Sequence, residues 1–228
     1  MAIARVTSAS GFQNDVDATL NTSYTVAAGD NRLLVVGACL DSGKPFVSVT
    51  YNAIGATQDK LQGNAAETAY AALYSLVAPD VTTADVVVTK TGTTGIVSAA
   101  IANYTGCKQT AQPDATASAS SASASSASYT ITTVVDDCWI MTSEYDNIGG
   151  IVNGTNFVQV TSPTNGIYLG DSNASVGAAG VKTIAFSWGS AGPYRAASGS
   201  YAPWIEVAAS TRSPGGGTAH SGGGSFSF

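Results

Sequence analysis

The fold is decided by residues 32–40, which read Arg32-Leu33-Leu34-Val35-Val36-Gly37-Ala38-Cys39-Leu40. After Arg32 this run has no charged residue, and turn-forming residues flank it at Gly29-Asp30 and at Asp41-Ser42-Gly43. An apolar run of this length between turn signals, rich in valine and leucine, is typical of a strand buried on both faces. We therefore expect residues 32–40 to form the central strand of a packed sheet that the rest of the chain covers.

Alternating apolar and polar residues predict further strands on both sides of this run. In residues 45–51 apolar and hydroxyl side chains alternate, as in a strand with one face inward and one toward water. Residues 69–76 also fit an amphipathic helix, but Pro79 and the neighbouring strands favour a strand. The predicted strands are residues 6–12, 22–26, 32–40, 45–51, 69–76, 85–90, 95–104, 129–134, 138–145, 157–160, 181–188 and 204–209.

Residues 55–67 and 189–195 are interpreted as loops. In residues 181–188, which directly precede the second loop, two sets of side chains alternate strictly, so each set lies on one face of a predicted strand. Their inward face is predicted to consist of Lys182, Ile184, Phe186 and Trp188. Many short strands, frequent turn signals and no convincing helix predict an all-β fold, an antiparallel β-sandwich or jelly roll.

Residues 111–128 are the most biased segment, with only Ala, Ser and one Thr from position 115 to 128. The tract is either a flexible connector or a strand of small side chains lying flat against another surface. Because strands are predicted on both sides of it, we interpret it as a crossing within a single domain of residues 1–212. We expect Ser118 and Ser123 of this tract to contact neighbouring subunits.

The last segment, residues 213–228, is a glycine-rich tail that cannot build a core of its own. We expect a neighbouring subunit to hold this tail. In that interpretation the rings of Phe226 and Phe228 insert into the neighbour and are subunit contacts.

The composition excludes several kinds of partner. Charged residues make up only 11% of the 228 residues, and the formal net charge is −6. Nucleic-acid binding draws its affinity from clustered Lys and Arg, and none of the 9 basic residues lies in a cluster. No membrane-spanning run and no secretory start are evident, so we expect no nucleic acid, no membrane and no signal peptide. A surface rich in Ser and Thr in place of Lys and Glu often accompanies β-rich extracellular or virion proteins.

No catalytic constellation is present. The one histidine, His220, lies in the tail, which excludes Ser-His-Asp and Cys-His sites in the folded domain. Asp41-Ser42-Gly43 matches the aspartic-protease signature, but no second copy supplies the required partner carboxylate, so it is interpreted as a turn. No spacing rule selects a pair for glycoside cleavage among Glu67, Glu144, Asp146, Asp171 and Glu206. We therefore predict no enzyme activity and no cofactor.

The cysteines and the Asp15-x-Asp17 pair give no metal site. Calcium needs six or more oxygen ligands from a defined loop, and none is present here. No Cys-x-x-Cys pair is present. We expect the three cysteines, Cys39, Cys107 and Cys138, to be small buried side chains. A disulfide between Cys107 and Cys138 remains an open alternative.

Several aromatic residues lie near predicted turns and strand ends, where a flat ring can stack on a sugar ring. The candidates for glycan stacking are Tyr194, Tyr201 and Trp204. Packing in the core or between subunits is the alternative role for such residues. The predicted loop 189–195 is where exposed aromatic and basic side chains are expected.

Five segments carry a resemblance to a known domain type. In chain order they are Asn-Arg-Leu-Leu-Val-Val-Gly (31–37), Val-Ser-Val-Thr-Tyr (47–51), Tyr-Ser-Leu-Val-Ala-Pro (74–79), Ala-Asn-Tyr-Thr-Gly (102–106) and Ala-Phe-Ser-Trp (185–188). Together they resemble a β-jelly-roll domain type of phage virion proteins and bacterial surface proteins. The resemblance covers residues 20–209, implies a jelly-roll fold, and brings no functional residue with it.

Two functional hypotheses follow. The first is a non-enzymatic phage virion structural protein, a capsid decoration or head or tail fibre component made in the host cytoplasm and located in the virion. Its expected partners are a major capsid or fibre protein and further copies of the chain, because burial between symmetric copies stabilises a particle. The alternative is a carbohydrate-binding module that holds surface glycans with exposed aromatic rings.

Overall fold

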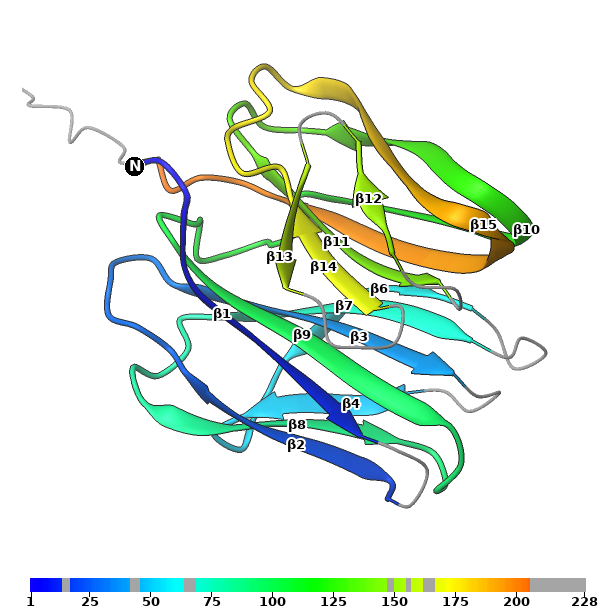
Figure 1. The fold of residues 1–228 in the computed structure, drawn as a ribbon. Helices are drawn as coiled ribbons and strands as arrows, with labels where there is room; N and C mark the ends of the chain where they lie inside the picture. Colours follow the sequence, from blue (N-terminus) through cyan, green and yellow to red (C-terminus); the bar gives the residue numbers. More distant parts are fainter. Residues whose placement is uncertain are drawn as a thin grey trace, which may run out of the picture.

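The computed structural model describes residues 1–13, 17–41, 46–63, 69–146, 150–154, 157–161 and 167–205. These residues form antiparallel strands in three stacked sheets and no helix (Figure 1). The prediction of an all-β antiparallel sandwich is therefore confirmed, with a third sheet that the sequence did not indicate. No described segment is a helix with the length and apolar character needed to cross a membrane.

The three sheets differ in position, and each is named here by its place. The central sheet has the order β1 (Ala4–Gln13), β9 (Ile96–Thr105), β3 (Leu33–Asp41), β7 (Tyr70–Val77) and β6 (Thr57–Gln62). The outer sheet has the order β2 (Thr19–Thr25), β8 (Thr83–Lys90), β4 (Phe46–Tyr51) and β5 (Ile54–Gly55). The folded sheet has the order β10 (Ala115–Thr133), β15 (Gly180–Tyr201), β11 (Trp139–Asp146), β14 (Ile167–Asp171) and β13 (Val158–Thr161), and β12 (Val152–Asn153) also pairs with β15.

Strand β3 occupies the middle of the central sheet, between β9 and β7, as its sequence predicts. Because side chains alternate across a strand, its apolar run supplies two cores at once. Leu33, Val35 and Cys39 pack toward the folded sheet. Leu34, Val36, Ala38 and Leu40 pack toward the outer sheet. The uninterrupted apolar run is thus explained by a sheet on each face.

Strands β10 and β15 form one long antiparallel ribbon that folds back over the rest of its sheet (Figure 1). The pairing passes from Ala124–Gly192 to Ser126–Ser187, so β15 has extra residues at the bend. A third core cluster lies inside the folded sheet, between the folded-back part of the ribbon and the rest of the sheet. It includes Ile131, Ile140, Ile184, Phe186, Trp188 and Tyr194. The Tyr129 hydroxyl joins these two parts through a 2.6 Å hydrogen bond with the Ser198 hydroxyl.

Of the two alternatives for the Ala/Ser tract, the strand is the one realised, because residues 115–128 lie within β10. Other predictions about individual segments are corrected. Residues 189–195 lie within β15 and are not a loop. Residues 57–62 form β6, and β14 was missed altogether. Trp204 and Ile205 belong to no strand, and residues 206–209 lie outside the described residues.

The inward face predicted for residues 181–188 is confirmed for its three apolar members, since Ile184, Phe186 and Trp188 are buried. All three cysteines are buried and free, so the alternative of a Cys107–Cys138 disulfide is not realised. The tail of residues 213–228, with Phe226 and Phe228, lies outside the described residues, as does Asp15.

A substitution at Gly37 tests the close approach of the central and folded sheets. A Cβ atom there would lie 3.0 Å from the Ser143 hydroxyl oxygen and 3.3 Å from a methyl carbon of Leu169. We expect Gly37→Val to lower the free energy of unfolding by about 1–3 kcal/mol through overpacking. Chemical denaturation measures the change. Gly55→Val is the matched control, because nothing lies within 4 Å of a Cβ at Gly55; equal effects of the two variants would contradict the packing described.

Candidate functional site

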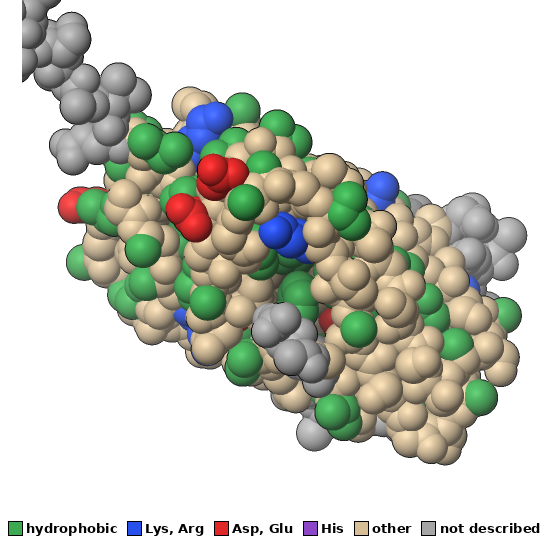
Figure 2. Space-filling view, turned by 90° about the horizontal axis from the view of Figure 1, so that it is seen from above, with side chains coloured by type: hydrophobic (Ala, Val, Ile, Leu, Met, Phe, Trp, Pro, Cys, Tyr) green, Lys and Arg blue, Asp and Glu red, His purple; other side chains and the backbone are tan. Residues whose placement is uncertain are grey.

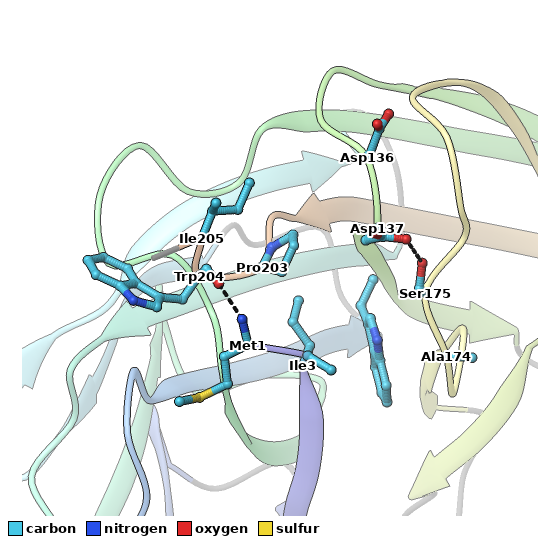
Figure 3. Close-up of a pocket in the computed structure, with 11 residues that line it drawn as sticks. Met1, Ile3, Asp136, Asp137, Ala174, Ser175, Pro203, Trp204 and Ile205 are labelled. Carbon is cyan, nitrogen blue, oxygen red and sulfur yellow. Dashed lines mark hydrogen bonds between the residues drawn. The ribbon is translucent and has the colours of Figure 1, made fainter. Parts of the chain in front are cut away.

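An open pocket of about 950 Å³ lies at one end of the molecule, where segments distant in sequence meet (Figure 3). Its walls come from residues 1–3, from the Asp136-Asp137 turn before β11, from Ala174-Ser175 after β14, and from residues 203–205 after β15. Trp139 of the core also lines it. The pocket is therefore lined by segments that adjoin the central sheet and the folded sheet, and by the last described residues.

Hydrogen bonds hold these segments in place. The amino group of Met1 donates to the carbonyl oxygen of Trp204 at 2.8 Å, and the Trp204 amide donates to the carbonyl of Gly106 at 2.7 Å. On the other wall the Ser175 hydroxyl donates to the Asp137 carboxylate at 2.7 Å (Figure 3). The segment after β15 is thus tied to the N-terminal segment and to the loop after β9.

The surface around the pocket combines exposed apolar side chains with carboxylates. Met1 is 61% exposed, Trp204 38% and Ile205 64%. The indole of Trp204 points away from the pocket centre, while Asp136 and Asp137 stand on the opposite side (Figure 3). The pocket thus combines exposed apolar side chains with one hydroxyl–carboxylate pair, Ser175 and Asp137.

Two of the three predicted glycan-stacking residues are placed where no sugar can reach them. Tyr201 is fully buried, and its hydroxyl donates to the Asp59 carboxylate at 2.5 Å. Tyr194 is 7% exposed and packs edge-on against Phe186 in the third core cluster. Trp204 alone is exposed. The prediction of an exposed platform from these rings is therefore wrong, because Tyr194 lies under the folded-back ribbon and Tyr201 lies between the central and folded sheets.

The two serines predicted at subunit contacts both lie on β10. Ser118 is half-buried and lies opposite Ala197 of β15, whereas Ser123 is exposed at the bend of the ribbon. Their role in contacts stays a prediction.

The carboxylates considered for glycoside cleavage are dispersed or enclosed. Glu67 and Glu206 lie outside the described residues. Asp171 accepts hydrogen bonds from the Arg5 guanidinium and the Tyr104 hydroxyl, both at 2.9 Å. Burial raises the pKa of Asp171, and the nearby Arg5 lowers it in part. Asp171 is therefore a buried structural ion-pair partner.

Glu144 and Asp146 are brought together on one face of β11, because they are two residues apart in a strand. Glu144 is 1% exposed and Asp146 is fully buried, so a substrate has no access to them in this arrangement. Neither carboxyl oxygen of Glu144 has a hydrogen-bond partner among the described residues. Burial is the main cause that raises the pKa of Glu144 to about 8; the nearby Thr142 side chain opposes the rise and the neighbouring Asp146 adds to it. At neutral pH Glu144 is consequently a protonated, uncharged core residue.

Sequence reasoning singled out Trp204 at the end pocket but missed its neighbours. Met1 and Trp204 are 203 residues apart, and only the stacking of the sheets brings them together. Asp59 was also missed, because β6 was interpreted as a loop. Burial raises the pKa of Asp59 to about 6, although hydrogen bonds from Tyr201 and Ser75 favour its charged form.

Comparisons with known proteins add no assignment. No family model matches the chain, no curated protein matches it, and no solved structure matches its fold.

The raised pKa of Glu144 predicts how stability depends on pH. The folded chain holds a proton up to about pH 8, whereas the unfolded chain releases it near 4.5, so stability falls as pH rises between these values. We expect the Glu144 contribution to approach 1.4 kcal/mol per pH unit, to within about a factor of two, between pH 6 and 8. Glu144→Gln removes that slope, as measured by denaturation at several pH values.

Asp59, whose pKa is about 6, also contributes to the slope near pH 6, but it is present in both the parent and Glu144→Gln, so the difference between their slopes reports Glu144. Asp85→Asn is the control, because Asp85 is an exposed carboxylate on the outer sheet. It should keep the slope of the parent chain. If Glu144→Gln and the parent had parallel stability curves from pH 6 to 8, the buried position of Glu144 would be wrong.

Proposed function

We propose that the chain is a non-enzymatic phage virion structural protein of jelly-roll type, a capsid decoration or head or tail fibre component. In this role it stabilises the particle through contacts with other virion subunits and with further copies of itself. Its location is then the virion. The proposal extends the resemblance of residues 20–209, and the surface at the end pocket is the observation that carries it.

That surface has the character of a contact region. Met1, Trp204 and Ile205 all line the end pocket and expose apolar side chains, at the first and last described residues of the chain. Clustered exposed apolar side chains mark interaction sites more often than isolated ones do. Trp is moreover among the residues that dominate binding energy at protein interfaces.

The remaining surface is consistent with a structural role. Figure 2 shows a face on which charged side chains are few. The titratable residues at the centre of the folded sheet are enclosed. The glycan-binding alternative, in contrast, has lost two of its three rings to the core.

A particle-binding experiment tests the proposal. We expect Trp204→Ser combined with Ile205→Ser to weaken co-sedimentation with purified particles of the phage that encodes the chain by about tenfold or more, because interface aromatic residues carry much of the binding energy. Deletion of residues 213–228 should have a similar effect if the tail inserts into a neighbour.

The matched control changes two exposed apolar residues of the outer sheet, Val47→Ser with Ile54→Ser, whose side chains are 62% and 44% exposed. This control should bind as the parent does, and thermal unfolding should show that all variants are folded. Undiminished binding by both the Trp204/Ile205 variant and the tail deletion would overturn the proposed contact surface. A parent chain that never binds particles would overturn the virion role itself.

A further inference from the structure

Strand β10 forms one edge of the folded sheet and pairs only with β15 among the described strands. It is 19 residues long, so it presents an unusually long row of backbone donors and acceptors that no described strand pairs. Such a row is a ready template for another strand. The edge, and not the small size of its side chains, is what makes β10 a candidate interaction surface.

The other sheet edges of the described chain are guarded in the ways that natural proteins use against edge-to-edge pairing. In the central sheet, β1 has Arg5 and a register shift beside it, and β6 has Asp59, Lys60 and a register shift. Strands β5 and β13 have only 2 and 4 residues. The outer-sheet edge β2 is uncharged but has only 7 residues and contacts β1 through the Thr7–Tyr24 hydrogen bond.

Strand β10 has neither charge nor proline anywhere along its length. Its one interruption is the bend at Ser121–Ser126, which divides the edge in two. The first half is approached by β6, since Gln62 donates a hydrogen bond to the Ser120 hydroxyl at 3.1 Å. The second half, residues 126–133, has no such neighbour among the described residues. It is therefore the unguarded part of the edge.

Partly buried apolar side chains of β10 pack against the third core cluster. The third core cluster has six partly buried apolar neighbours, and five of them lie on β10: Ala115, Ala117, Ala119, Ala124 and Tyr129. In the second half, Ala127 and Ile131 face inward and are buried, whereas Ser126, Ser128, Thr130 and Thr132 face outward and are exposed. A strand added here would cover the flank of Tyr129 and would need to bring no charge.

We propose that residues 127–133 pair with the same residues of a second copy of this chain, antiparallel and about a two-fold axis at Thr130. An identical edge can pair with itself in this way, which makes the contact self-complementary. Residues directly opposite each other in an antiparallel pair point to the same side, so the axis must lie at a residue. With the axis at Thr130, the inward Tyr129 meets Ile131 of the second copy.

This register also places the two Thr130 side chains opposite each other on the outward face. Aromatic–β-branched pairs and Thr–Thr pairs are both stabilising across strands. The pairing makes the β10–β15 ribbon of one copy continuous with the ribbon of the second copy. It also extends the third core cluster across the two-fold axis. It deepens the proposed virion role by naming the surface for self-association, but it is a property of the isolated chain.

Thr130→Lys tests the edge in the full chain. Two lysines facing each other across the axis repel, so we expect the dimer dissociation constant to rise by roughly tenfold or more in sedimentation experiments. Thr183→Lys is the matched control, because Thr183 is exposed on the same face and lies opposite Thr130 on β15, one strand away from the edge. It should leave the dimer intact.

A cysteine variant tests the register without relying on repulsion. The native cysteines are buried, so Thr130→Cys introduces a thiol that is exposed among the described residues. Directly opposite positions in an antiparallel pair bring the Cβ atoms near disulfide distance. We expect mild oxidation to give a covalent dimer with Thr130→Cys and none with Thr183→Cys.

The outcomes separate this inference from the virion role. A parent chain that is monomeric, a Thr130→Lys variant that dimerises as the parent does, or a Thr183→Lys variant that dissociates equally would overturn edge pairing. Failure of Thr130→Cys to cross-link would overturn the register. None of these results bears on whether the Trp204 surface binds particles, which is measured separately.

Discussion

Burial of β3 on both faces is the constraint on which the rest of the structure depends. A strand whose successive side chains are all apolar cannot leave either face in water, so it requires one sheet above and another below. The central sheet meets this requirement with two clusters that share β3, β7 and β9. Gly37 marks how closely the folded sheet approaches, because a Cβ there would lie 3.0 Å from the Ser143 hydroxyl oxygen.

The same constraint explains why β10 and β15 are so long. Once β11, β14 and the second half of β15 cover the central sheet, their opposite face carries Ile140, Tyr168 and Tyr194 and needs cover of its own. The ribbon supplies that cover by folding back. Polar groups are caught inside, and they are accommodated in two ways. Tyr129, Ser198 and Thr142 share hydrogen bonds, and Glu144 stays protonated.

The sequence was informative where local pattern and tertiary environment agree. The apolar run predicted β3 and its double burial, and the alternation in residues 181–188 predicted which apolar side chains face inward. It failed where long-range pairing outweighs local preference. The polar segment Thr57–Gln62 is a strand only because it pairs with β7. Gly189, Gly192 and Pro193, which resemble a loop, serve the bend of β15 instead.

The candidate site was less predictable than the fold for a related reason. Tyr194 and Tyr201 lie between layers, and no local pattern reports that a sheet will fold over one of them or stack on the other. The end pocket joins Met1 to Trp204, a pairing with no signal in the intervening sequence. Trp204 was included among the aromatic residues near predicted turns and strand ends, but it was also predicted to begin a strand, which the structure does not show.

The low content of charged residues affects both the core and the sheet edges. Three packed layers need mostly apolar and small side chains, and the few charged residues are partly used inside, as at Arg5–Asp171 and Glu144. Few charges then remain to guard the sheet edges. Short length or a register shift protects most of them, and the bend protects the middle of β10. Residues 126–133 have none of these protections. The ribbon that completes the core therefore also presents the edge of the described chain that is best able to pair with another strand.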